Sequence, residues 1–174
     1  LFPDPRFFPE WETISGSFTH ESVDTSVDKQ TLVKLAGRLA DLPAGFTVHP
    51  RLKGVLDKRL DAVNTGEGID WAGAEALAFA SLLAEGHSVR LSGQDVGRGT
   101  FSQRHSVIWD YETGQSHIPL NNVEASQAPF EVYNSLLAEA GVLGFEYGYA
   151  VTRPQVLTLW EAQFGDFANV AQVV

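Results

Sequence analysis

The sequence predicts an α/β protein with a mostly parallel sheet flanked by helices. Two short runs, residues 87–93 (HSVRLSG) and 156–162 (VLTLWEA), are typical of strands. They alternate with helical patterns at residues 71–84 and 136–150, and a further helix is expected to start at residue 164. Because parallel strands need a crossover connection, usually a helix, this alternation favours a mostly parallel sheet.

Local signals support individual elements of this fold. Asp70 is a good N-cap for the helix over residues 71–84, and Gly86 is a plausible stop. This helix is apolar nearly all round, so we expect it to be buried on several sides, in a core or in a subunit interface. Residues 105–110 and 116–120 flank the turn Tyr-Glu-Thr-Gly-Gln and are expected to pair as a hairpin.

A helical linker is expected before the α/β part. Leucine and valine recur at helical spacing behind a cap at Ser26, and again after His49. The stretch Asn-Thr-Gly-Glu-Gly at residues 64–68 then breaks the pattern. We therefore expect an arm and helical linker over residues 1–65 and an α/β domain over residues 66–174.

The first 25 residues contain prolines and aromatic side chains without a regular period, which is typical of an extended arm. Phe7, Phe8 and Trp11 would be costly to leave in water. They cover either a partner surface in a larger protein or this same domain, and the sequence favours neither alternative.

Composition limits the classes of function. The 174 residues are 44% hydrophobic and 20% charged, as in globular proteins, and the net charge of −10 argues against nonspecific binding to nucleic acid or to an anionic membrane. No apolar run approaches the roughly 20 residues of a membrane span. The lack of cysteine excludes disulfides, thiolate metal sites and a cysteine nucleophile. The lack of methionine, even at position 1, leads us to expect a processed chain or a piece of a longer one.

The glycine-bearing loop over residues 93–105 (GQDVGRGTFSQRH) is a candidate functional segment. It lacks GxGxxG and the Lys-Ser/Thr of a phosphate loop, so we expect a positioned loop whose Arg98, Arg104 and His105 face a neighbouring domain. The five histidines lack metal-site spacing, which argues against a zinc site. His105 is the one functional candidate among them, with a structural hydrogen-bonding role as an equal alternative.

Glu139 is a candidate proton donor near the start of the helix expected over residues 136–150. Its neighbours include Leu136 and Leu137, and an apolar setting would favour the protonated form of a carboxyl. A first-turn acid that stabilises the helix dipole is the alternative that the residues alone favour. Glu146, seven residues on, is a competing candidate.

Phe164 and Phe167 lie three residues apart in the segment WEAQFGDFAN, hence on one face of a starting helix. An aromatic pair of this kind is usually core. It can also offer a face on which a heteroaromatic ring stacks.

Three long segments carry a resemblance to a known family. GIDWAGAEALAFASLLAEGHSVRLSGQDVGRGTFSQRHSV, NSLLAEAGVLGFEYGYA and LWEAQFGDFANVAQV resemble the central part of the decarboxylating first component of 2-oxoglutarate dehydrogenase. The resemblance runs from about residue 43 to residue 174 and is weaker over the arm. It implies the start of a transketolase-like, pyrimidine-binding domain of a thiamine diphosphate enzyme.

The resemblance also implies roles for particular residues. Glu139 would hydrogen-bond a nitrogen of the cofactor's pyrimidine ring, and His105 would be a further catalytic residue. Phe164 would stack on the ring, with Phe167 and Gln94 as additional cofactor-binding residues. This sequence has Leu-Ala-Glu where the family usually has Leu-Ser-Glu, which puts a local hydrogen bond in doubt. The magnesium motif, a GDG followed by asparagines, is lacking, so Mg2+ and the diphosphate would bind to a domain outside this chain.

The parent enzyme would convert 2-oxoglutarate and pass a succinyl group to a lipoyl-bearing succinyltransferase component. Its expected partners are a homodimer subunit, that component and the 2-oxoacid substrate, with neither nucleic acid nor a membrane. The expected location is the bacterial cytoplasm, or the mitochondrial matrix in a eukaryote. Alternatives are a 2-oxoadipate enzyme, a decarboxylase without acyl transfer, or a segment that only dimerises or docks. We expect the segment by itself to be inactive.

Overall fold

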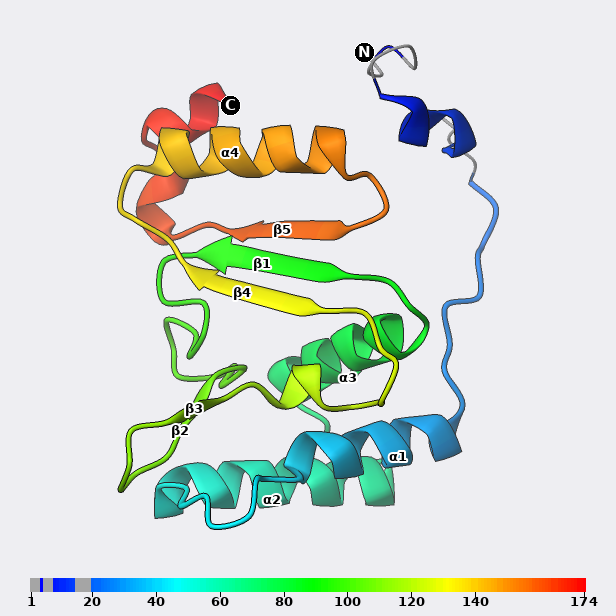
Figure 1. The fold of residues 1–174 in the computed structure, drawn as a ribbon, viewed down its shortest axis with the longest axis vertical. Helices are drawn as coiled ribbons and strands as arrows, with labels where there is room; N and C mark the ends of the chain where they lie inside the picture. Colours follow the sequence, from blue (N-terminus) through cyan, green and yellow to red (C-terminus); the bar gives the residue numbers. More distant parts are fainter. Residues whose placement is uncertain (1–3, 5–7, 15–19) are drawn as a thin grey trace.

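A computed structural model describes residue 4, residues 8–14 and residues 20–174. Within these residues, three parallel strands form a sheet in the order β4-β1-β5. They are β1 (Val89–Gly93), β4 (Phe130–Asn134) and β5 (Leu157–Glu161), and Leu91 pairs with Val132 on one side and Leu159 on the other. With helices on its flanks (Figure 1), this sheet confirms the predicted α/β class.

One face of the sheet forms the core with helix α3 (Trp71–Ala84). Side chains alternate across a strand, so Val89 and Leu91 of β1 point to the same face, where both are buried. The buried residues of this core come from α3, the strands and the segments around them: Leu35, Ala36, Val63, Leu77, Phe79, Ala80, Leu83, Val89, Leu91, Val96, Leu120, Val123 and Phe130. The opposite face of β1 carries Arg90, which bonds to helix α4 (Glu139–Thr152).

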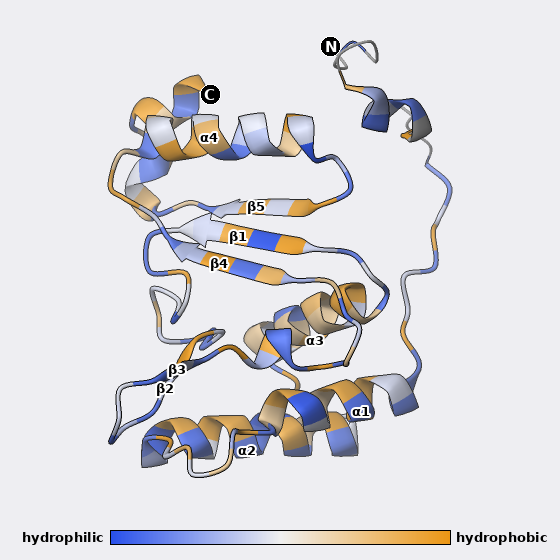
Figure 2. Cartoon of the chain, viewed as in Figure 1, coloured by the Kyte–Doolittle hydropathy of each residue, from blue (hydrophilic) through white to orange (hydrophobic). Residues whose placement is uncertain are grey.

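The two helices predicted before the α/β part are α1 (Lys29–Ala40) and α2 (Pro50–Thr65), which pack against each other and, through α1, against α3 (Figure 1). α1 starts two residues later than predicted, because the carboxylate of Asp28, rather than Ser26, caps it by accepting from Thr31 N at 3.0 Å. Figure 2 shows alternating hydrophobic and hydrophilic bands along α1 and α2, which is the pattern that predicted them.

The predicted helix at residues 71–84 is confirmed with its cap, since Asp70 Oδ1 accepts from Gly73 N at 2.6 Å. Its predicted burial on several sides is only partly correct. Leu77, Phe79, Ala80 and Leu83 are buried, but Trp71 is 93% exposed. The described part of the chain therefore covers only some of the apolar side chains of α3 and leaves Trp71 exposed.

β4 was not predicted from the sequence, the start of α4 was misplaced, and the helix expected after β5 does not form. α4 starts at Glu139, so residues 136–138 precede it. The helix expected from residue 164 is replaced by two short 3-10 helices, η3 (Phe164–Phe167) and η4 (Val170–Val173). Asn169 separates them, because its backbone is extended and its side chain accepts from Ala171 N at 2.9 Å.

The predicted hairpin forms as a two-residue ladder between β2 (Ile108–Trp109) and β3 (Ser116–His117), and a 3-10 turn, η2 (Pro119–Asn121), follows it. Among the helices of the described ranges, none is long and apolar enough to cross a membrane.

The arm contains a 3-10 helix, η1 (Pro9–Thr13), whose Trp11 indole donates to Val151 O of α4 at 2.7 Å. Gln155 also donates to Glu10 O at 3.3 Å. Trp11 thus folds back on this same chain. Phe7 lies outside the described residues.

Candidate functional site

The segments that carry the predicted site residues meet at the carboxyl ends of the parallel strands (Figure 1). The loop over residues 94–105 follows β1, residues 135–138 lead from β4 into α4, and residues 162–163 lead from β5 into η3. A Cβ on Gly93 would lie 2.7 Å from Glu161 O, so only glycine permits this close approach of β1 and β5. The carboxyl edge of an open parallel sheet is the usual place for a ligand.

Glu139 is the first residue of α4, where the positive end of the helix dipole favours a carboxylate. Gln94 Nε2, from the end of β1, donates to Glu139 Oε1 at 3.4 Å. The structure thus brings together two predicted site residues that are 45 positions apart. The expected apolar surroundings are not formed by Leu136 and Leu137, which are 80% and 75% exposed.

Phe164 and Phe167 are exposed, at 79% and 68%, so the usual interpretation as a core pair is wrong for the described chain. Phe101, which was not among the predicted site residues, joins them. Its ring centroid lies 6.1 Å from that of Phe164 at an interplanar angle of 75°, and all three rings line one pocket with Thr100. Its position in a polar loop gave no periodic signal by which to find it.

The loop after β1 is backbone-strained. Asp95, Ser102 and His105 have φ values of 58°, 54° and 54°, and they are the non-glycine residues with positive φ in the described ranges. Such conformations each cost about 1–3 kcal/mol and gather at functional sites.

Arg104 does not face a neighbouring domain, contrary to the sequence-based expectation. Its guanidinium is buried within this chain, where it donates to Glu75 of α3 at 2.6 Å and to Glu161 of β5 at 3.1 Å. Arg98 likewise bonds within its own loop, to Asp95 at 3.1 Å. Arg104 therefore ties the loop to the sheet and to α3.

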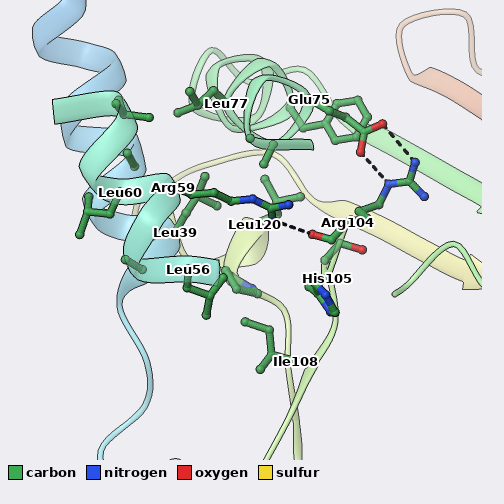
Figure 3. A pocket seen from close by; sticks show the side chains of 18 residues that line it. Leu39, Leu56, Arg59, Leu60, Glu75, Leu77, Arg104, His105, Ile108 and Leu120 are labelled. Atoms are coloured by element: carbon green, nitrogen blue, oxygen red, sulfur yellow. Dashed lines mark hydrogen bonds and ion pairs between the residues drawn. The ribbon is translucent and has the colours of Figure 1, made fainter. Parts of the chain in front are cut away.

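His105 lines a different pocket from the phenylalanines, between the loop and the linker helices (Figure 3). Arg59 reaches into this pocket from α2 and donates to Arg104 O at 3.2 Å. Burial lowers the pKa of His105, and the positive charges of Arg59 and Arg98 lower it further, against a backbone hydrogen bond at Ser102 that raises it. The imidazole is thus held neutral at pH 7, in a pocket that the phenyl rings of Phe164 and Phe167 do not line.

Glu146, the competing acid, is committed elsewhere. Both of its carboxylate oxygens accept from Arg90, at 2.8 Å and 3.0 Å, and the residue is buried. Of these two candidate acids, Glu139 is therefore the one at the carboxyl edge of the sheet. Within the ranges that the structure describes, no group of three or more histidine or acidic side chains is placed to hold a metal ion.

Residues 67–173 match the family model described as transketolase, pyrimidine binding domain. The chain belongs to this family.

Relatives of this pyrimidine-binding domain include proteins named 2-oxoglutarate dehydrogenase E1 component. The one from Brucella anthropi is 57% identical over 150 residues, and those from Brucella ovis and Brucella canis are 56% identical. Each alignment covers 86% of this chain and 15% of the relative. The chain thus spans a small part of the length of these relatives.

Proposed function

We propose that this chain is the pyrimidine-binding part of a thiamine diphosphate-dependent oxidative decarboxylase that acts on 2-oxoglutarate. The domain itself would comprise residues 66–174, with residues 1–65 as its arm and linker. The observation that carries the proposal is the placement of Glu139 and two exposed phenyl rings at one edge of the sheet, linked through Gln94. The shared name of the relatives favours 2-oxoglutarate over 2-oxoadipate.

The residues at this edge fit an aminopyrimidine ring. An exposed phenyl face offers stacking, which is worth about 0.5–1.5 kcal/mol beyond burial of area, and Phe164 and Phe167 offer such faces. The Glu139 carboxyl offers a hydrogen bond to a ring nitrogen, and Gln94 orients that carboxyl. When bound, thiamine diphosphate supplies the electron sink for decarboxylation. Mg2+ and the diphosphate would be held by another segment of the longer protein.

His105 would act on the substrate side rather than on the pyrimidine ring. Its lowered pKa gives a neutral imidazole that can donate or accept one hydrogen bond near pH 7. Its position apart from the phenylalanine pocket supports a role toward a group brought by another segment.

In the full-length protein, the partners would be a second subunit, a lipoyl-bearing succinyltransferase component and the 2-oxoacid. The proposed location is the bacterial cytoplasm. The names and bacterial origin of the relatives support these assignments.

The proposal is tested by cofactor binding to the full-length protein. Phe164→Ala should raise the Kd of thiamine diphosphate by about 3- to 10-fold, because one stacking face is lost. The matched control is Phe46→Ala, which removes a ring that contacts His117 near the linker. Isothermal titration with Mg2+ present measures both. Equal Kd values for the two variants, or no binding by the wild-type protein, would contradict the proposal.

A further inference from the structure

The side chain of Gln163 bridges the two loops that carry the proposed ring site. Its Nε2 donates to Thr100 Oγ1 at 2.7 Å and to the main-chain oxygen of Gln94 at 3.2 Å. Thr100 Oγ1 is also 3.1 Å from Gln163 Oε1, so the hydroxyl can donate in return. One amide therefore joins the end of β5 to the loop after β1.

Gln163 is itself held in place. Its backbone N–H donates to Asp166 Oδ2 at 2.8 Å, and Asp166 is buried and also accepts from Asn169 Nδ2 at 2.8 Å. This capping box fixes the turn between Phe164 and Phe167. The bridging amide thus projects from a rigid base rather than from a free loop.

The groups joined by this amide are those that the ring site needs. Gln94, whose carbonyl accepts from Gln163, donates to Glu139 with its own side chain. Thr100 precedes Phe101, and Gln163 precedes Phe164, whose rings are in edge contact. A shift of Gln163 would therefore move the acid's partner and the stacking face together.

The strained loop after β1 is held by several side-chain contacts, and this bridge is one of them. Asp95 and Ser102 hold positive φ values on either side of Thr100, and such conformations persist only when the surroundings fix them. Sixty-three residues separate Thr100 from Gln163, so the bridge depends on the parallel pairing of β1 with β5.

We propose that Gln163 is a positioning residue for the cofactor-ring site, acting through Gln94 on Glu139 and through Thr100 on the paired phenyl rings. This inference rests on the proposed function. Nothing in it requires Gln163 to touch the cofactor.

The test uses the full-length protein with four variants: Gln163→Ala, Thr100→Val, the double variant and Thr100→Ser. Each of the first two should raise the Kd of thiamine diphosphate and lower kcat by about tenfold, as expected for a lost pair of hydrogen bonds. The double variant should be no worse than either single one, because both break the same bridge. Thr100→Ser keeps the hydroxyl and should restore affinity to within about twofold of wild type.

A merely structural role predicts a different pattern. If Gln163 only stabilised the fold, Gln163→Ala and Thr100→Val would lower the free energy of unfolding, while the folded variants would keep the wild-type Kd of thiamine diphosphate and the wild-type kcat. The matched control is Gln115→Ala, an exposed glutamine in the turn between β2 and β3, which should behave as wild type. The KM for 2-oxoglutarate should stay constant while kcat falls, since the bridge lies on the cofactor side.

The outcomes separate the two proposals. If the wild-type protein binds thiamine diphosphate and Gln163→Ala and Thr100→Val bind it equally well, the bridge is overturned and the proposed function stands. If the wild-type protein does not bind it, both are overturned. If Gln163→Ala fails to fold, as judged by circular dichroism, Thr100→Val and Thr100→Ser on the exposed loop test the bridge instead. A higher Kd of thiamine diphosphate for Thr100→Val than for Thr100→Ser supports the bridge, and equal Kd values overturn it.

Discussion

Arg90 of β1 and Glu146 of α4 form a bidentate ion pair, with Nε–Oε2 and Nη2–Oε1 distances of 2.8 Å and 3.0 Å. The side chains are 12% and 5% exposed. The guanidinium also lies 4.6 Å from the ring centroids of both Tyr133 and Tyr149. Since α4 begins with Glu139, this pair anchors the helix that presents the proposed catalytic acid.

Glu146→Gln should therefore lower stability without abolishing chemistry. Removal of one partner leaves a buried guanidinium only partly compensated by Glu131, which Arg90 also contacts at 3.1 Å. Breaking a buried pair costs about 3 kcal/mol or more in free energy of unfolding. Urea denaturation of the full-length protein measures the loss.

The control is Asp57→Asn, which breaks the exposed Lys53–Asp57 pair of α2 and should cost less than about 1 kcal/mol. Similar losses for the two variants would show that the Arg90–Glu146 pair is not an anchor. Complete loss of decarboxylation in a folded Glu146→Gln protein would make Glu146, rather than Glu139, the acid.

Arg98→Gln should raise the pKa of His105. Burial is the main cause of the lowered value, and the charge of Arg98 adds to it, so its removal should shift the pKa back toward the ordinary value of about 6.5. Hydrogen–deuterium exchange at the imidazole C2 position, followed by mass spectrometry across pH, measures this in a large protein. Arg38→Gln on α1 is the control.

The sign of the stability effect follows from the same shift. In the unfolded state, His105 takes up a proton near pH 6.5. In the folded state, its pKa is lower, so the imidazole stays neutral to a lower pH. Its contribution to stability is therefore full above about pH 6.5 and is lost as pH falls through the lower folded-state pKa. An unchanged exchange profile in Arg98→Gln would contradict the electrostatic coupling.

Asp110 should make the hairpin acid-sensitive. Hydrogen bonds from the backbone N–H groups of Thr113, Thr47 and Glu112 lower its pKa to about 2, against an unfolded value of about 3.9. Because the folded pKa is the lower one, the stabilisation is present above about pH 4 and is lost as pH falls toward 2.

Asp110→Asn removes that titration. The difference in Tm between wild type and this variant should shrink as the pH is lowered from about 4 to 2. Thermal unfolding across that range measures it, with Asp57→Asn as the control. Parallel Tm curves for wild type and Asp110→Asn would show that these hydrogen bonds do not set the acid response.

The sequence predicted those parts of the fold that depend on nearby residues. The cap at Asp70 and the apolar spacing of α3 are local, and both are present. β4 escaped prediction because its residues Phe130–Asn134 become a strand only by pairing with β1, some forty positions away. The two 3-10 helices after β5 depend on backbone N–H groups that donate to the side chains of Asp166 and Asn169. The spacing of apolar residues in the sequence does not reveal such hydrogen bonds.

The site was predictable in a different way. Glu139, Phe164 and Phe167 were candidates from the residues themselves, and the resemblance added Gln94 and gave each of them a role. The structure brings Glu139 and Gln94 into contact and exposes the phenyl rings. The bridge between Thr100 and Gln163 was not predictable, since it depends on strand pairing across the sheet.

The central claim is that Glu139 is the acid for a bound pyrimidine ring, and Glu139→Gln in the full-length protein tests it most directly. The variant should bind thiamine diphosphate within about tenfold of wild type and keep its fold, because glutamine retains the shape and one hydrogen bond. Decarboxylation of 2-oxoglutarate, followed as release of CO2, should fall by about 100-fold or more, the usual range for loss of a positioned proton-transfer group. Near-normal turnover by a cofactor-loaded Glu139→Gln protein would contradict the account.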